Sequence, residues 1–217
     1  MNDYEKPDYY SKLAIKEGYA ARSVYKLMEI QEKLTLIKKG DKILDLGCAP
    51  GSWSQYASSL IGHDGQLIGV DFKRITVNPP NATFIYGNFF RDHIKDEIMS
   101  YSPFNGVISD MAPDTSGDRL TDCFLSSELV RHALDFAYLY LKKGGYFIAK
   151  IFQGGDEKEI MDEMKLAFEK VKWFKPKSSR QISFEIFMIG SGFIKKPEIH
   201  SNDEILNDDN YSGDMPW

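Results

Sequence analysis

Short apolar runs alternate with amphipathic stretches along most of the chain. The apolar runs predict strands, which we place at residues 42–47, 66–71, 82–87, 105–110, 145–151, 171–175 and 184–191. Apolar residues at a helical spacing predict a helix from Ser23 onwards and further helices at residues 52–61, 91–100, 121–142 and 156–170. Such alternation is typical of a mainly parallel sheet with helices on both faces.

The last two predicted strands are the exception, because no long helix separates them. Only residues 176–183 lie between them, which favours a hairpin-like return and an antiparallel last strand. We therefore predict one α/β domain at residues 19–196, with a mostly parallel seven-stranded sheet. Residues 1–18 show no clean period and form an N-terminal extension, whereas the polar, acidic composition of residues 197–217 predicts a disordered tail.

The overall composition suits one globular domain. The chain has 217 residues, and 42% of them are hydrophobic, which is enough for a sizeable core. No apolar run approaches the roughly 18 residues of a membrane span, and the first residues lack the apolar region of a secretion signal. Cys48 and Cys123 form no metal-ligand or redox pattern. We therefore expect a cytoplasmic protein without a metal site or a membrane partner.

The net charge of -5 conceals an uneven distribution of charge. Residues 197–217 contain six acids and no Lys or Arg, so the rest of the chain has 27 basic against 26 acidic residues. Two segments are dense in basic residues: Lys12, Lys16, Arg22, Lys26, Lys33, Lys38, Lys39 and Lys42, and then Lys170, Lys172, Lys175, Lys177 and Arg180. Local basic patches of this kind are typical of phosphate-binding surfaces, although an ordinary solvated surface has the same appearance in sequence.

A glycine-containing turn follows the first predicted strand. The pattern is Asp45-x-Gly47-x-x-x-Gly51, with Pro50 inside the turn and a helix-forming segment after it. Ligands bind at such turns in open α/β sheets, because glycine lets backbone amides approach them closely. A dinucleotide fold would have G-x-G-x-x-G, and no second glycine follows Gly47 at that spacing. The wider turn favours the S-adenosylmethionine (SAM) loop of a methyltransferase.

Four charged residues interrupt apolar segments. Asp110 ends one predicted strand, Lys150 lies near the end of another, Glu185 begins the last, and Lys26 lies in the first helix. Burying an isolated charge is costly, so these residues are expected to pair. An antiparallel last strand brings Asp110, Lys150 and Glu185 to one edge of the sheet, beside the glycine turn. A purely structural ion pair and an active site would both explain this pattern.

The sequence blocks around these residues resemble the FtsJ/RrmJ family of SAM-dependent RNA 2′-O-ribose methyltransferases. The similar blocks are residues 22–27, 45–55, 109–113, 150–154 and 177–180, followed by Glu185. The resemblance covers about residues 19–194 and implies a Rossmann-like methyltransferase domain. It also implies that Lys26, Asp110, Lys150 and Glu185 form a catalytic tetrad.

The resemblance implies roles for the turn residues in holding SAM. Gly47, Gly51 and Trp53 would line the methionine side, with Pro50 in the same turn, and Asp110 would border it. Asp71 would take the ribose hydroxyls, because an acid at about this spacing does so in nucleotide folds. Asn88 would bond the adenine amino group, with Phe89 beside it. Two positions depart from the family pattern, since Ser52 replaces a glycine and Asn88 an aspartate. An ordinary core position is the alternative for Trp53, but its place in the loop favours the cofactor site.

A ribose hydroxyl is a weak nucleophile, so methyl transfer needs alignment and a proton acceptor. We assign the proton acceptor to Lys150, its orientation to Asp110, and positioning of the ribose to Lys26 and Glu185. The expected contacts to RNA phosphates are Lys12, Arg22, Lys33, Lys38 and Arg180.

The resemblance points to a uridine in large-subunit (23S) ribosomal RNA, within a pre-assembled ribosomal particle, and to a monomeric enzyme. Transfer RNA is the main alternative substrate. A non-catalytic ribosome-assembly factor stays open as a second class, although the intact tetrad opposes it. An NAD-dependent dehydrogenase is disfavoured by the missing glycine pattern.

The acidic segment yields a first prediction. Deleting residues 198–217 should leave the melting temperature and SAM affinity unchanged, because the segment has few hydrophobic residues to place in a core. RNA binding at low salt should become tighter, since six acids no longer repel phosphate. Thermal melting and a salt series of RNA binding measure both effects. A large drop in melting temperature on truncation would contradict the prediction.

Overall fold

The computed structural model describes residues 8–180 and 183–197, so the expected disorder beyond Pro197 lies outside the described residues. Seven strands form one sheet: β1 Lys42–Leu46, β2 Gln66–Asp71, β3 Ala82–Tyr86, β4 Phe104–Ser109, β5 Leu141–Phe152, β6 Phe168–Phe174 and β7 Glu185–Phe193. Their order is β3-β2-β1-β4-β5-β7-β6. Only β7 runs antiparallel to its neighbours, so the predicted fold class is confirmed.

Six helices surround the sheet in the described residues: α1 Tyr9–Glu17, α2 Val24–Leu34, α3 Ser52–Ile61, α4 Asp92–Ser100, α5 Arg119–Tyr140 and α6 Glu157–Ala167. The sequence pattern did not indicate α1. Its signals are at its ends, where Asp8 accepts a hydrogen bond from the Ser11 N–H at 2.9 Å and Gly18 ends the helix at φ 77°.

The boundary between α6 and β6 differs from the predicted one. The apolar stripe continues past Ala167, so the sequence favoured a helix to residue 170. Phe168 instead begins β6, where its ring lies 5.4 Å from that of Phe193 and 6.5 Å from that of Phe147. The β7 partner therefore overrides the helical pattern at this point.

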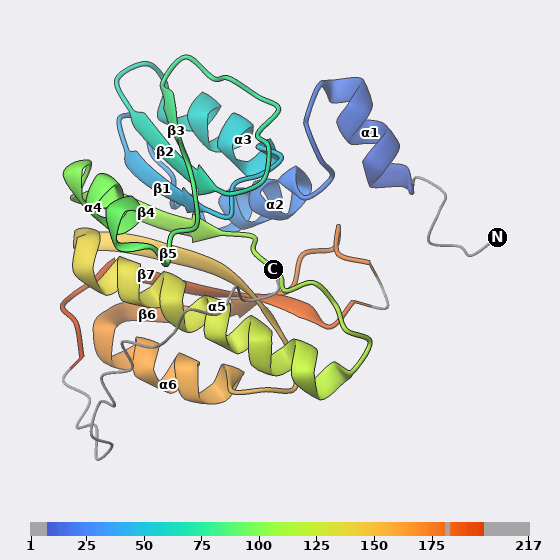
Figure 1. Cartoon of the computed structure of the whole chain (residues 1–217), viewed down its shortest axis with the longest axis vertical. Helices are drawn as coiled ribbons and strands as arrows, with labels where there is room; N and C mark the ends of the chain where they lie inside the picture. The colour runs from blue at the N-terminus through green and yellow to red at the C-terminus, as the bar shows by residue number, and fades with distance from the viewer. Residues whose placement is uncertain (1–7, 181–182, 198–217) are drawn as a thin grey trace.

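Two apolar layers cover the sheet. Helices α4, α5 and α6 bury one face with residues such as Leu44, Val107 and Phe147, and α5 and α6 run along this face in Figure 1. Helices α2 and α3 cover the other face, against Ile43 and Ile148. Adjacent strand residues thus enter opposite layers, as buried parallel strands do. None of the described helices is long and apolar enough to cross a membrane.

The carboxyl group of Asp45 is buried between the sheet and α3. It lies in β1, is 1% exposed, and accepts a hydrogen bond from Ser54 Oγ at 2.6 Å. Burial raises the pKa of Asp45 from 3.8 to about 7; the Ser54 hydrogen bond opposes this shift, and the charges of Asp110 and Asp71 add to it. The folded protein therefore keeps a proton on Asp45 that the unfolded chain releases above pH 3.8.

The buried proton on Asp45 determines how the free energy of unfolding changes with pH. Between pH 3.8 and about 7 the folded state binds more protons at Asp45, so stability falls as pH rises across this window. Asp45→Asn should remove ~4 kcal/mol of this pH dependence, because one pKa unit corresponds to about 1.4 kcal/mol. Urea unfolding at several pH values measures the effect, with Asp64→Asn at the exposed surface as control. Parallel pH profiles for wild type and Asp45→Asn would exclude the buried proton.

Candidate active site

The four charged residues of the predicted tetrad meet at one edge of the sheet. Lys26 Nζ lies 2.8 Å from Glu185 Oε1 and 3.7 Å from Asp110 Oδ1. Lys150 Nζ lies 3.1 Å from Asp110 Oδ1 and donates to the Asp110 carbonyl oxygen at 2.7 Å. The prediction that these side chains converge is confirmed. Their catalytic roles remain predictions.

Strand register and an aromatic floor position these side chains. In the antiparallel β5–β7 pair, Lys150 lies opposite Phe187 and Phe152 lies opposite Glu185. Lys26 reaches the same edge from the first turn of α2, with its Nζ 5.8 Å from the centroid of the Phe187 ring. β5, β7 and α2 therefore present Lys150, Glu185 and Lys26 above an apolar surface, and Asp110 joins them from the end of β4.

The cluster combines burial with balanced charge. Lys26 and Lys150 are each 8% exposed and Glu185 is 9% exposed. Burial lowers the pKa of Lys26, but the Asp110 and Glu185 carboxylates outweigh it, and the net shift is upward. Burial raises the pKa of Asp110, whereas Lys150 and Lys26 lower it more, so this carboxyl stays ionised. Two cations and two anions thus compensate one another's desolvation.

A cavity of about 130 Å³ adjoins this cluster through Asp110. It is formed where β1, β2, β3 and β4 end, and its walls are Gly47, Ala49, Val70, Asp71, Phe72, Lys73, Gly87, Asn88, Phe89, Asp110, Met111, Ala112 and Leu129. It lies next to the point between β1 and β4 at which the strand order reverses, where open α/β sheets bind ligands. Five of the expected cofactor residues, namely Gly47, Asp71, Asn88, Phe89 and Asp110, line it.

Both loop glycines are required by their surroundings. Gly47 has φ 71°, and a Cβ there would lie 2.0 Å from Cγ of Met111. Gly51 has φ 113°, and its Cβ would lie 2.2 Å from Cγ2 of Val77. The positive φ angles and close neighbours explain why only glycine fits. The role of Met111 as a wall of the cavity was missed from sequence, although it directly follows Asp110.

The side chains of Asp71 and Asn88 accept hydrogen bonds from nearby backbone amides, and each can accept a further hydrogen bond from a ligand. Asp71 Oδ2 accepts the Ala49 N–H at 2.9 Å, and its Oδ1 accepts the Lys73 N–H at 2.7 Å. Asn88 Oδ1 accepts the Phe90 N–H at 3.0 Å. Each of these oxygens has a second lone pair, which suits the hydroxyl groups of a ribose at Asp71 and the amino group of an adenine at Asn88.

The other expected cofactor residues are not among those that line the cavity. Trp53 is 2% exposed, donates its indole N–H to the Ser23 carbonyl at 2.9 Å, and stacks on Phe187 with 5.6 Å between ring centroids. Its side chain is thus used in the core, as the alternative interpretation proposed. The carbonyl of Pro50 accepts hydrogen bonds from the Thr76 N–H and hydroxyl, each at 3.0 Å, which ties the loop after β2 to the glycine turn.

The expected RNA contacts occupy different parts of the surface. Arg22 is largely buried, pairs with Asp8 and donates to the Ser178 carbonyl, and Arg180 Nε lies 3.7 Å from the same Asp8 carboxylate. Lys12 is exposed on α1, and Lys33 lines a groove between α2 and β6 together with Lys175 and Lys177.

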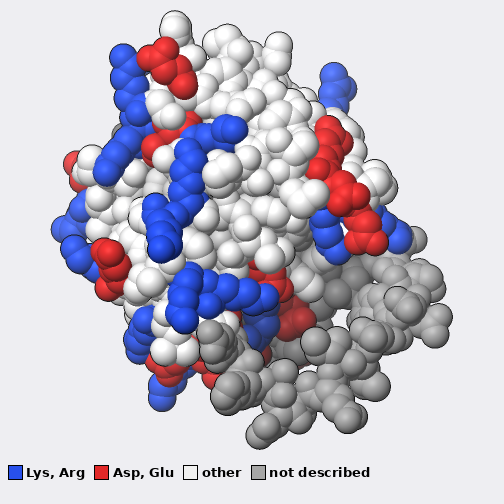
Figure 2. Space-filling view, turned by 90° about the vertical axis from the view of Figure 1, so that its left-hand side faces the viewer, with Lys and Arg blue, Asp and Glu red and all other residues white. Residues whose placement is uncertain are grey.

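Lys38 lies apart from the other expected RNA contacts. It precedes β1 and lines a hollow with Lys142 and Lys143 near the start of β5. This is the amino end of the parallel strands, opposite the edge that carries the tetrad. Figure 2 views this side, where Lys and Arg side chains form a band across the surface. Lys38 therefore lies away from the active site, and its contact with RNA stays a prediction.

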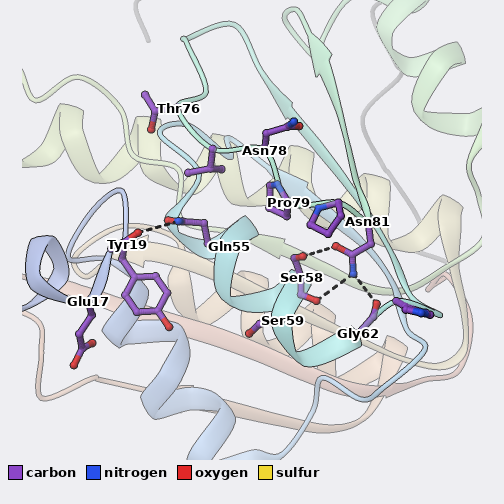
Figure 3. A pocket seen from close by; sticks show the side chains of 14 residues that line it. Glu17, Tyr19, Gln55, Ser58, Ser59, Gly62, Thr76, Asn78, Pro79 and Asn81 are labelled. Atoms are coloured by element: carbon purple, nitrogen blue, oxygen red, sulfur yellow. Dashed lines mark hydrogen bonds between the residues drawn. The ribbon is translucent and has the colours of Figure 1, made fainter.

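A larger cavity of about 990 Å³ lies beside α3 and contains none of the tetrad residues (Figure 3). Its polar groups largely bond to one another: Gln55 Nε2 donates to the Gly18 carbonyl at 3.0 Å, and Asn81 Nδ2 donates to the Ser58 and Gly62 carbonyls. Within the described part of the chain, no Lys or Arg side chain lines it. Neither its charge nor its position matches the chemistry expected at the tetrad.

Comparisons with known proteins agree with this arrangement. Residues 19–193 match the model of the family described as FtsJ-like methyltransferase. The chain is 46% identical over 190 residues to the ribosomal RNA large subunit methyltransferase E of Bdellovibrio bacteriovorus, covering 86% of this chain and 97% of that protein. It is 41% identical over 194 residues to the protein of the same name from Treponema denticola, covering 88% and 98%.

Solved structures show the same fold. A ribosomal RNA methyltransferase from Plasmodium falciparum superposes with a TM-score of 0.71 at 30% identity, covering 82% of this chain and 100% of that one. Fibrillarin of Aeropyrum pernix, solved with natively bound S-adenosyl-L-methionine, superposes with a TM-score of 0.52 at 18% identity, covering 77% of this chain and 76% of that one, and shares the fold. The match over nearly the whole described body places this chain in the FtsJ-like methyltransferase family.

Proposed function

We propose that this methyltransferase transfers a methyl group from SAM to the 2′-hydroxyl of a ribose, on a uridine in large-subunit (23S) ribosomal RNA. The observation that carries the proposal is the charge-balanced tetrad beside the cavity at the strand ends. The curated relatives, which match over most of their own length, carry the name of an enzyme of large-subunit ribosomal RNA.

The residues around the cavity fit SAM. Asp71 offers lone pairs for ribose hydroxyls, and Asn88 offers one for the adenine amino group. Asp110 lines the cavity, and its carboxylate, which Lys150 and Lys26 keep ionised, suits the positively charged methionine end. SAM supplies a methyl group that is already electrophilic because it is bound to a sulfonium.

Lys26 and Lys150 have different surroundings, and we assign them different roles in methyl transfer on that basis. Lys26 lies between the carboxylates of Asp110 and Glu185, and its raised pKa keeps it protonated. Lys150 has one carboxylate partner, Asp110, which also fixes the direction of its amine through the backbone carbonyl. We assign the removal of the ribose hydroxyl proton to Lys150 in its neutral form. Lys26 and Glu185 hold the ribose in line for attack.

The substrate and its setting extend the proposal. A 2′-hydroxyl acceptor means RNA rather than DNA. We propose that a monomer acts in the cytoplasm on RNA within a pre-assembled ribosomal particle. Methyl transfer to unmethylated large subunits, to protein-free large-subunit RNA and to total transfer RNA tests this choice. Incorporation into transfer RNA alone would overturn the ribosomal substrate, and SAM binding without transfer to any of the three would favour an assembly factor.

Asp71→Ala should weaken SAM binding by about 1.5–3 kcal/mol, the usual worth of hydrogen bonds to a charged group. The carboxylate also holds the Ala49 and Lys73 amides, so melting temperature is measured in parallel. Isothermal titration with SAM gives the affinity, and Asp64→Ala at an exposed position is the control. Wild-type affinity in a folded Asp71→Ala protein would remove Asp71 from the site.

Lys150→Ala should fold, bind SAM with near wild-type affinity and lose at least the roughly 100-fold in single-turnover rate that general bases contribute. Lys150→Arg should not restore the rate, because guanidinium cannot accept the proton. Lys26→Arg is the matched control, since a permanent cation is what we assign to that position; it should keep more activity than Lys150→Arg.

A purely structural ion pair predicts a different result for the same variants. Removing Lys150 from a buried pair would then cost about 3–5 kcal/mol of stability. Melting temperature, SAM affinity and rate, measured on each variant, separate these cases. Near wild-type turnover in Lys150→Arg would reject Lys150 as the base.

A further inference from the structure

An arginine at the start of α5 lies against an aromatic ring at the catalytic edge of the sheet. The guanidinium carbon of Arg119 lies 5.1 Å from the centroid of the Phe184 ring, and its NH2 group donates to the Gln153 carbonyl at 3.3 Å. The ring of Phe184 in turn contacts the ring of Phe152 edge to face, with centroids 4.7 Å apart. Arg119 and Phe184 are therefore held as one unit, which we call the Arg119–Phe184 pair.

This pair is attached to β5 and β7, the strands that carry Lys150 and Glu185. Phe184 directly precedes Glu185, the first residue of β7. The carbonyl of Phe184 accepts the Gln153 N–H at 2.9 Å, and Gln153 follows Lys150 by three positions. The pair thus lies beside the tetrad, at the end of the β5–β7 ladder.

The charge of Arg119 has no ion-pair partner among residues 8–180 and 183–197. Other arginines differ in this respect: Arg22 pairs with Asp8, and Arg131 pairs with several acids on α5 and α6. Arg119 is exposed, and its hydrogen bond to Gln153 uses a small part of the five N–H donors of a guanidinium. Its charge and its outer face are both available to a ligand.

We propose that the Arg119–Phe184 pair is a stacking subsite for an unpaired nucleobase next to the methylated ribose. Sequence-tolerant RNA sites commonly hold splayed bases on arginine planes and aromatic rings. Phe184 keeps the guanidinium of Arg119 in place from one side, so the base stacks on the other side. A phosphate needs only a flexible cation, whereas a guanidinium supported by a ring is suited to a flat partner. The inference rests on the proposed RNA substrate.

Arg119→Ala and Arg119→Lys test the subsite with a 12-nucleotide single-stranded RNA and with unmethylated large subunits. Both variants should weaken RNA binding by about 5- to 150-fold, the range measured for loss of one stacked base. KM for large subunits should rise while SAM affinity and the single-turnover rate at saturating RNA stay near wild type. Arg119→Lys should keep the salt dependence of binding, because it keeps the charge.

An RNA of the same length made of abasic nucleotides isolates the role of the base. Wild type and Arg119→Lys should bind this RNA equally, because both keep the charge. With the natural RNA, Phe184→Leu should resemble Arg119→Lys. Lys143→Ala, which removes one exposed charge at the opposite edge, is the control and should leave KM unchanged.

Two results would contradict the proposed stacking subsite. Wild-type RNA affinity in Arg119→Lys would show that Arg119 contributes only charge. A lower melting temperature with reduced SAM affinity and unchanged KM would show that the pair only supports the loop after β5. The binding measurements with single-stranded RNA do not depend on which RNA the enzyme methylates. If the wild-type enzyme modified transfer RNA alone, the proposed ribosomal substrate would be refuted, but the test of base stacking would still be valid.

Discussion

Burial of charge at the carboxyl edge of the sheet is the constraint on which the site depends. Two lysines and two carboxylates lose most of their solvent there, and each alone would be costly to bury. Their close contacts, between 2.8 and 3.7 Å, make the group neutral as a whole. The fold can therefore bury the cluster at a small cost in free energy. Loss of a proton from the cluster, or a charged ligand beside it, changes its net charge or its electrostatic energy.

The antiparallel last strand makes this cluster possible. A fully parallel sheet would bring the end of β7 to this edge, whereas the hairpin-like return brings its beginning, Glu185. The same arrangement places Phe187 beneath Lys26 and Phe184 against Arg119. One topological feature thus positions a tetrad carboxylate, the apolar floor and the proposed base-stacking subsite. The cofactor cavity depends on a second feature, the reversal of strand order between β1 and β4.

The sequence was most informative where chemistry opposed the local pattern. Asp110 and Lys150 stand out because charges rarely enter apolar strands, and strand direction then places them at one edge. Helix α1 escaped prediction because its determinants are two end residues rather than a periodic stripe. The start of β6 at Phe168 depends on pairing with β7, which no local pattern contains.

The sequence also does not show in which direction a side chain points. Trp53 follows the glycine turn in sequence, yet its indole group points into the core between Ser23 and Phe187. The position of Lys38 relative to the tetrad could be anticipated from sequence, because a residue just before a parallel strand lies at the amino edge, away from the catalytic end. Arg119 and Phe184 are 65 positions apart, so their contact could only be seen in three dimensions.

The central claim is that one buried lysine of the charge-balanced cluster must lose a proton for methyl transfer. The pH dependence of the single-turnover rate on unmethylated large subunits, at saturating SAM, tests it most directly. We expect the logarithm of the rate to rise with pH at a slope of about one before it reaches a plateau, as loss of one proton requires. A rate that stays constant from about pH 6 to about pH 9 in the folded enzyme would contradict the account.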